Sequence, residues 1–259
     1  MIANNAHGYP LDQTSFIRSC LYCIGCVSCP VLAGPPFQTA DPQPTQYRQH
    51  ELYMAVQPIK TSKGISGPLP YFELNYGALP NLELQIVAQA EFDSTQNEPA
   101  QYGYGDTELG MKYRFVQETP DHPMVGIFPL LEVPTGNASE NLGNGGTQIF
   151  LPVWIQKKWS DWQSYGGGGY WINNAPGQKN YWFWGWELQH DLSPYLTLGA
   201  EIFYNTEQKP GQGSSSGFNI GGFYKFDRQN HLLMAIGKGL VNASVTDIAS
   251  LYLGYEWIW

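Results

Sequence analysis

Apolar and polar residues alternate along most of the chain beyond residue 47, with a repeat of two. This repeat is typical of β-strands with one apolar and one polar face, because successive side chains point to opposite sides of a sheet. Between Leu82 and Phe92, for example, every second residue is apolar and the residues between them are Glu, Gln or Val. Runs of this kind predict twelve strands, at about 48–58, 68–76, 81–92, 103–117, 123–134, 147–158, 162–173, 181–190, 195–206, 217–227, 230–240 and 248–259.

The connections between these runs are of two alternating kinds. Short turns lie at 77–80, 118–122, 159–161, 191–194 and 227–230. Longer polar or glycine-rich loops lie at 59–67, 93–102, 135–146, 174–180, 207–216 and 241–247. Short turns at one rim and long loops at the other, joining an even number of strands, are typical of bacterial outer-membrane barrels. The pattern predicts an all-β fold, a single 12-stranded antiparallel transmembrane β-barrel over residues 48–259, with short periplasmic turns and longer extracellular loops.

Tryptophan positions separate a membrane barrel from a secreted β-sandwich, which alternation alone does not. Trp159 and Trp162 flank a short turn, while Trp171 and Trp182 lie near the long-loop rim. Two such groups are expected where a barrel crosses the two membrane interfaces. The alternate tryptophans from 182 to 186 would form a large exposed patch in water but are ordinary against lipid. We therefore expect Trp159, Trp162, Trp171 and Trp182 to form aromatic girdles in contact with outer-membrane lipid.

Composition narrows the class of protein further. Charged residues are only 14% of the chain, whereas aromatic residues are 15% and there are 29 glycines. This balance is too apolar for a disordered chain and fits strands joined by many turns. No run of about 18 apolar residues occurs, which excludes a helical membrane protein. The net charge of −9 repels phosphate, so we expect no nucleic-acid partner.

Residues 1–33 have the pattern of an export signal. Arg18 precedes a mostly apolar stretch, and Val31-Leu32-Ala33 matches the small-x-small cleavage rule, so we expect a mature chain that starts at Gly34. The signal excludes the cytoplasm as the destination. The same segment carries the four cysteines in a spacing close to an iron–sulfur ligand run, an alternative that stays open. These cysteines are Cys20, Cys23, Cys26 and Cys29.

Residues 34–47 differ from both the signal and the strands. They contain four prolines, which cannot donate to a β-ladder. We expect a Pro-rich leader whose stiffness lets it tuck into the periplasmic mouth of the barrel.

Two resemblances sharpen this interpretation. The ending from Tyr252 to Trp259, with Gly254, Trp257 and a terminal Trp259, resembles the C-terminal assembly signal of bacterial outer-membrane barrels. That resemblance implies recognition by the barrel-assembly machinery. Four stretches are similar to the outer-membrane family named for the MetA pathway of phenol degradation. They are residues 33–47, 105–115, 132–136 with 142–145, and 151–158 continuing to 162–170. This second resemblance implies a barrel that moves small, often aromatic, molecules across the outer membrane.

Candidate chemistry in the mature chain is sparse. Its histidines, His50, His122, His190 and His231, fall at or beside short turns, where we interpret them as interfacial turn residues. None has the neighbours that activate a nucleophile, and no His/Asp/Glu cluster has metal-ligand spacing. The glycine runs at 143–146 and 166–169 lack the Lys and Ser/Thr of a phosphate loop. We therefore expect no catalytic residue, no metal and no cofactor.

The polar register of the strands identifies the side chains that face the lumen. Acidic residues outnumber basic ones in this set, which supports two interpretations. One is a hydrogen-bonded ion network that fills a narrow barrel. The other is an acidic constriction that prefers cations or neutral solutes. The set is Glu51, Glu73, Glu83, Glu91, Asp106, Glu108, Glu132, Glu187, Glu201 and Glu256 against Lys112, Arg114, Lys158 and Lys225.

Together these patterns predict a protein of the Gram-negative outer membrane. The function they favour is a porin-like channel for small-molecule solutes, aromatic or hydrophobic ones among them, through a net-acidic lumen. Two alternatives remain from the sequence. One is an outer-membrane barrel enzyme of the lipid hydrolase type, and the other is a plugged structural or adhesive barrel.

Overall fold

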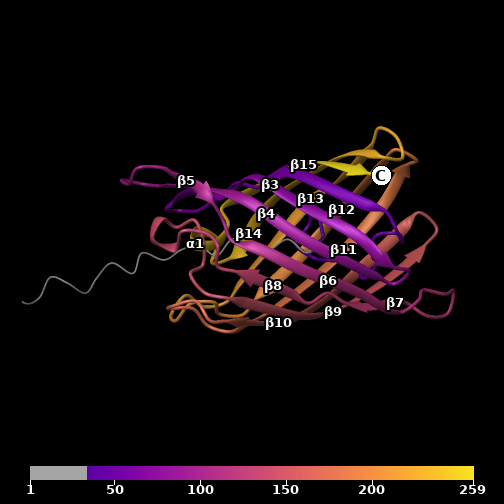
Figure 1. The fold of residues 1–259 in the computed structure, drawn as a ribbon, viewed down its shortest axis with the longest axis horizontal. Coiled ribbons are helices and arrows are strands. Elements are labelled where there is room, and N and C mark those ends of the chain that lie inside the picture. The colour runs from indigo at the N-terminus through magenta and orange to yellow at the C-terminus, as the bar shows by residue number, and fades with distance from the viewer. Residues whose placement is uncertain (1–33) are drawn as a thin grey trace, which may run out of the picture.

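The computed structural model describes residues 34–259, so the predicted export signal and its cysteines lie outside the described residues. These residues form one antiparallel sheet, closed into a barrel whose strands are inclined to its long axis (Figure 1). A 3₁₀ helix, η1 (Ala138–Glu140), and a short helix, α1 (Ala243–Thr246), lie in the loops. No helix among residues 34–259 is long and apolar enough to cross a membrane. The strands are β1 (His50–Val56), β2 (Ile59–Lys60), β3 (Gly64–Leu79), β4 (Leu82–Thr95), β5 (Gln101–Tyr104), β6 (Thr107–Val116), β7 (Met124–Ile127), β8 (Leu130–Val133), β9 (Gln148–Trp159), β10 (Trp162–Asn173), β11 (Tyr181–Ser193), β12 (Leu196–Asn205), β13 (Ser215–Lys225), β14 (Asn230–Val241) and β15 (Ala249–Ile258).

The fifteen segments make twelve barrel strands, because β1 continues into β2, β5 into β6 and β7 into β8. Pro58 and Pro129 interrupt two of these strands, since proline has no N–H for the ladder. Closure occurs where β15 pairs with β14 on one side and with β1 on the other. The backbone N–H and C=O of Trp259 add hydrogen bonds of 3.1 and 2.9 Å to His50 at the end of this seam. The predicted 12-stranded antiparallel barrel is confirmed.

Two connections are shorter than the sequence pattern suggests. The predicted loop at 59–67 is mostly strand, with Ile59 opposite Ser66 and Lys60 opposite Ile65 around a tight turn. The predicted loop at 93–102 is shortened in the same way, because β4 and β5 extend the hairpin past the end of the alternation. Backbone ladders need no alternating side chains, so the hydrophobic pattern alone underestimates strand length here.

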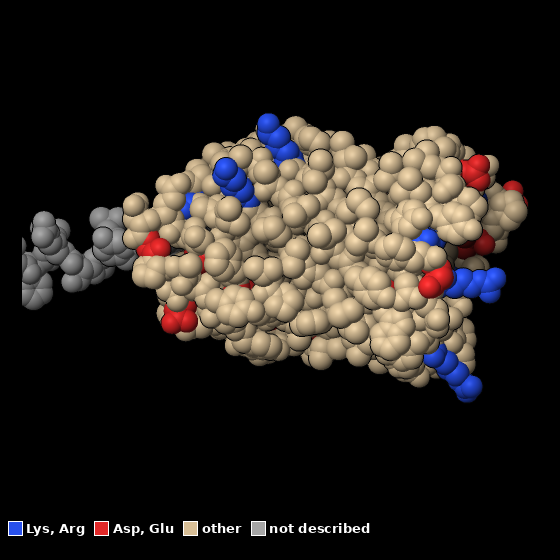
Figure 2. All heavy atoms as spheres, turned by 90° about the horizontal axis from the view of Figure 1, so that it is seen from above, with Lys and Arg blue, Asp and Glu red and all other residues tan. Residues whose placement is uncertain are grey.

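The outer surface of the barrel is apolar between its two ends. Charged side chains gather toward the ends on the face in Figure 2, and the surface between them is almost free of charge. Trp159, Trp162, Trp182 and the C-terminal Trp259 are 40–47% exposed. The loop elements β5 and α1 lie at one end of the barrel and the C-terminus at the other (Figure 1).

Trp171 does not belong to an outer aromatic girdle, contrary to the sequence prediction. It is 4% exposed and lies inside the barrel, where its ring stacks on Phe150 at 4.6 Å and on Tyr181 at 5.9 Å. Along β10 the odd-numbered residues face inward, so Trp162 faces outward whereas Trp171 cannot. Tyr170, the next residue back, takes the outer position and packs on Trp182 at 5.0 Å.

Candidate functional site: a lumen occupied by the leader

The Pro-rich leader lies inside the barrel. Its C-terminal end is held at the short-turn rim, where Tyr47 forms a β-bridge with Gly77 at the end of β3. From there the chain runs inward to Thr39, beside Glu201 about midway along β12. Phe37, Thr39 and Ala40 are fully buried. The leader therefore enters the barrel, as predicted, but it extends beyond the mouth to the middle of the lumen.

Glu201 holds the inner part of the leader. Its two carboxylate oxygens accept hydrogen bonds from the backbone N–H of Gln38 at 2.8 Å, the backbone N–H of Thr39 at 2.9 Å and the Thr39 hydroxyl at 2.6 Å. Asn219 on β13 donates a further bond of 2.6 Å to the same carboxylate. Hydrogen bonds to an ionised acceptor are stronger than neutral ones, so this carboxylate fixes the leader to the wall.

Glu83 on β4 holds the outer part of the leader in the same way. It accepts bonds from the backbone N–H of Thr45 at 2.7 Å and from the Thr45 hydroxyl at 3.0 Å. Lys112 on β6 lies 3.8 Å from Glu83 and 3.9 Å from Asp41 of the leader, and so links the two. Arg114 donates a bond of 2.8 Å to the side chain of Gln43. Four residues that the sequence assigned to the lumen thus bind the leader rather than line an open passage.

Apolar contacts complete the seat of the leader. Phe37 packs with Tyr71, Leu233 and other residues of the wall formed by β1, β3, β4, β14 and β15. Ala40 packs against a separate cluster on the facing wall that contains Phe128 and Trp154. The leader therefore bridges two apolar clusters across the barrel, and burial of this surface favours the inserted state.

Inward-facing glycines make room for the leader. A Cβ at Gly185 on β11 would lie 2.1 Å from the Thr39 hydroxyl, and one at Gly126 on β7 would lie 3.0 Å from Pro42. These glycines occupy positions where the alternation would otherwise place a side chain in the lumen. Their position, together with Phe37 in the leader, is the signal in the sequence that the leader is part of the interior, and strand alternation alone does not reveal it.

Two chambers lie on either side of the leader. A polar chamber of about 450 Å³ opens toward the short-turn rim and is lined by Gly34, Pro35 and Asp41 of the leader. A second chamber of about 370 Å³ opens among the long loops, with Gln38 in its lining. Both lie in a single barrel, so residues 36–40 separate two halves of what would otherwise be one passage.

Most remaining inward acids are bound by neutral donors. Glu73 accepts bonds from Tyr71, Asn75 and Gln85, at 2.5, 2.8 and 2.8 Å. Glu187 accepts a bond of 2.6 Å from Gln189. These side chains belong to a hydrogen-bonded network inside the wall.

At the long-loop end the acids hold a loop in place. Asp106 accepts bonds from the backbone N–H groups of Gly136 and Asn144, at 2.9 and 2.6 Å. Glu132 accepts bonds from the side chains of Asn144 and Gln148, at 2.5 and 2.7 Å. Glu108 lies opposite Glu132 in the sheet and is 4% exposed, and Glu91 on β4 is 6% exposed.

Three further charged residues lie nearer the short-turn mouth. Lys158 is largely exposed and lies 3.6 Å from Asp191, while the Lys225 ammonium lies 5.2 Å from the centre of the Phe223 ring. Glu256 is buried and accepts a bond of 2.8 Å from Tyr53.

His231 also contacts Glu256, with its Nδ1 at 2.6 Å from the carboxylate. His231 is 9% exposed, so it is an interior residue and not the interfacial turn residue that its sequence position suggested. His190, by contrast, stacks on Trp162 at 4.2 Å at the outer surface. A carboxylate–histidine pair needs a nucleophile within hydrogen-bond reach for hydrolysis, and the contact that Glu256 makes besides His231 is to the phenol of Tyr53. Within residues 34–259, no group of three or more His, Cys, Asp or Glu residues is placed to hold a metal ion.

Comparison with solved structures supports the fold. No family model and no curated protein matches the sequence. The structure is similar to the COG4313 outer membrane channel from Pseudomonas putida F1, with a TM-score of 0.72 and 14% identity over 85% of this chain and 98% of that one. The NanC porin gives a TM-score of 0.58 at 9% identity, covering 80% and 98% of the two chains. The KdgM porin in complex with disordered oligogalacturonate gives 0.54 at 10% identity, covering 81% and 98%.

At these identities the likeness establishes the fold, a barrel of the type found in outer-membrane channels. The resemblance to the family named for the MetA pathway stays a prediction.

Proposed function

We propose that this chain is an outer-membrane channel for small molecules and that its leader controls passage through the barrel. The observation that carries the proposal is the pair of chambers separated by residues 36–40 inside one closed barrel. The apolar, nearly uncharged belt between two charged ends fits a barrel that crosses a lipid bilayer (Figure 2). The names of the structural neighbours, which are channels and porins, support the same function.

Passage requires the leader to move, since it fills the middle of the lumen. Its attachments are hydrogen bonds to Glu201, Glu83 and Arg114, the ion pair of Asp41 with Lys112, and two apolar contacts. All of them are non-covalent, and among the described residues the segment joins the barrel at one end only. A segment held this way can leave the lumen without unfolding the sheet, which is stabilised by its own closed ladder.

A plugged structural barrel is the second candidate, and the same leader supports it. Flux separates the two functions. In planar bilayers, the folded chain should give ion currents that increase when the leader is loosened, and liposomes that contain it should admit small solutes. Silence from protein shown to be folded, with the leader both seated and loosened, would favour the structural barrel.

Ion selectivity needs a variant that leaves the leader seated. Glu83→Lys is unsuitable, because Glu83 binds Thr45 and the substitution would displace the leader. Glu108 on β6 lies opposite Glu132 on β8, so its partner in the sheet belongs to the wall and not to the leader. If the interior acids set selectivity, Glu108→Gln should lower cation preference in a salt gradient, and unchanged selectivity would remove Glu108 from the pathway.

A further inference from the structure

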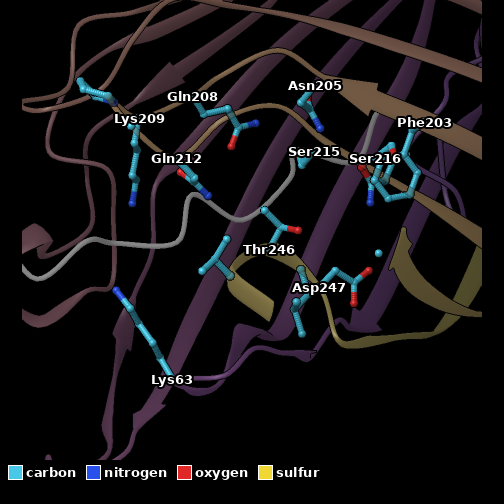
Figure 3. A pocket seen from close by; sticks show the side chains of 16 residues that line it. Lys63, Phe203, Asn205, Gln208, Lys209, Gln212, Ser215, Ser216, Thr246 and Asp247 are labelled. Carbon is cyan, nitrogen blue, oxygen red and sulfur yellow. The ribbon is translucent and has the colours of Figure 1, made fainter. Parts of the chain in front are cut away.

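The long-loop chamber has the size of a small-molecule site. It measures about 370 Å³, within the range of about 300–1,000 Å³ that is usual for ligand pockets. Its inner end is formed by Gln38 of the leader and Phe203 of β12. Lys63, in the turn between β2 and β3, and Lys209, in the loop after β12, line its outer part (Figure 3).

The inner end holds buried acceptors that lack donors. In the part of the chain that the structure describes, Gln38 Oε1 and Asp247 Oδ1 have no hydrogen-bond partner. Gln38 is 7% exposed and Asp247 is 6% exposed. A buried acceptor without a partner costs about 1–3 kcal/mol, a cost that a hydroxyl group of a ligand would remove.

A smaller chamber of about 40 Å³ continues inward past Gln38 and Ile59. Gln57 Nε2 and the Tyr252 hydroxyl are in its lining and are also buried without a partner. A space of this volume exceeds the roughly 10–15 Å³ that one water needs, so it has room for a hydroxyl group. The polar groups at the inner end therefore offer both donors and acceptors to such a group.

The outer end has the opposite character. The ammonium groups of Lys63 and Lys209 point toward one another in Figure 3, on the side away from Phe203 and Asp247. A carboxylate placed between two ammonium groups is attracted to both of them. Between the two ends, Ile59, Phe203 and Val245 supply apolar surface.

Asp247 lies in the loop before β15. Burial raises the pKa of its carboxyl above the usual range, although a hydrogen bond from Ser250 acts against this. The Ser250 hydroxyl donates to Oδ2, so Oδ1 is the oxygen left without a partner among the described residues.

We infer that this chamber binds a small hydroxylated carboxylate, with its hydroxyl group at Gln38 and Asp247 and its carboxylate between Lys63 and Lys209. The inference rests on the proposed function, because it assigns a class of solute to the outer side of the channel. Its distinguishing property is that the two ends of the ligand are recognised by different residues.

A ligand series crossed with variants tests both ends. The probes are 4-hydroxybenzoate, benzoate, which lacks the hydroxyl, and 4-hydroxybenzyl alcohol, which lacks the charge. Binding to the full chain in detergent micelles is measured by titration calorimetry, with empty micelles as the blank. The variants are Lys63→Gln and Asp247→Asn. Lys238→Gln and Glu98→Gln are the matched controls, since both residues are exposed and lie outside the chamber.

Lys63→Gln should weaken 4-hydroxybenzoate and benzoate about five-fold, as expected for a partly exposed ion pair, and leave 4-hydroxybenzyl alcohol unchanged. Asp247→Asn should reduce the preference for 4-hydroxybenzoate over benzoate about five-fold, because it exchanges a charged acceptor for a neutral one. Neither control should change any affinity.

Liposome flux of 4-hydroxybenzoate separates failure of this inference from failure of the proposed function. Equal affinities in all variants, or flux without measurable binding, would overturn the site and leave the channel intact. Binding with the expected pattern, but no flux even with the leader loosened, would support the site and overturn the channel function.

Discussion

Exchange of one hydroxyl for a methyl group, Thr39→Val, should loosen the leader. The Thr39 hydroxyl donates to Glu201 at 2.6 Å, and valine keeps the branched shape while it removes this donor. The backbone N–H of Thr39 still reaches the carboxylate, so only one bond is lost. A hydrogen bond to a charged group contributes about 1.5–3 kcal/mol, which corresponds to a roughly 10- to 150-fold higher ratio of displaced to seated leader.

Single-channel recording in planar bilayers measures this ratio directly. We expect Thr39→Val to show more frequent openings than the parent chain, in proportion to the population of displaced leader. The matched control is Thr197→Val. Thr197 is also buried and also donates to a carboxylate, Asp191, at 2.5 Å, but this bond joins two strands of the wall.

Three results would refute the reasoning. Openings unchanged in Thr39→Val would show that the bond to Glu201 does not hold the leader. Equal increases in Thr39→Val and Thr197→Val would show that general loosening of the barrel, not release of the leader, causes the current. A loss of folded protein, seen as a lost shift in electrophoretic mobility between unheated and boiled samples, would place the effect on the sheet.

Four further outcomes are expected. Gly185→Leu should raise conductance by displacing the leader from its place against β11, because even a Cβ at this position would lie 2.1 Å from the Thr39 hydroxyl. Unchanged currents would contradict this packing. Gly168→Ala should lower the free energy of unfolding in urea by about 1–3 kcal/mol, since its Cβ would lie 2.6 Å from the Trp184 ring, and equal midpoints would refute this. Deletion of Trp259 should impair assembly in the membrane, because it removes two backbone hydrogen bonds from the closing seam; normal yields of folded barrel would contradict that role. Intact-mass analysis should find Gly34 as the first residue, whereas retained cysteines would favour the iron–sulfur alternative.

The barrel wall could be predicted from the sequence because a membrane barrel repeats one rule in every strand. Apolar residues face outward at every second position, as from Leu82 to Phe92, and turns restart the pattern. The rule failed where side chains stop alternating, at 59–67, since backbone pairing alone extends the strands there. A position near a rim does not by itself predict a girdle residue, since Trp171 has inward parity in β10.

The contents of the lumen could not be predicted in the same way. Glu83 and Glu201 were assigned to the interior by parity, but parity does not say what a side chain meets there. Their partners, Thr45 and Thr39, are 38 and 162 residues away in the chain, and no local pattern encodes such contacts. Even so, the leader was distinguishable as a segment, because its prolines exclude it from the sheet.

The occupied lumen changes how the surplus of acidic residues should be interpreted. A count by parity treats each inward carboxylate as facing an open passage, and on that count the barrel would reject anions. Glu201 and Glu83 instead bind the leader, and Glu73 is bound by three neutral donors. The charges that a solute would meet first at the long-loop end are therefore those of the chamber, where Lys63 and Lys209 lie at the opening. Selectivity would follow from the residues that line each chamber and from the position of the leader, and not from the net charge of the interior.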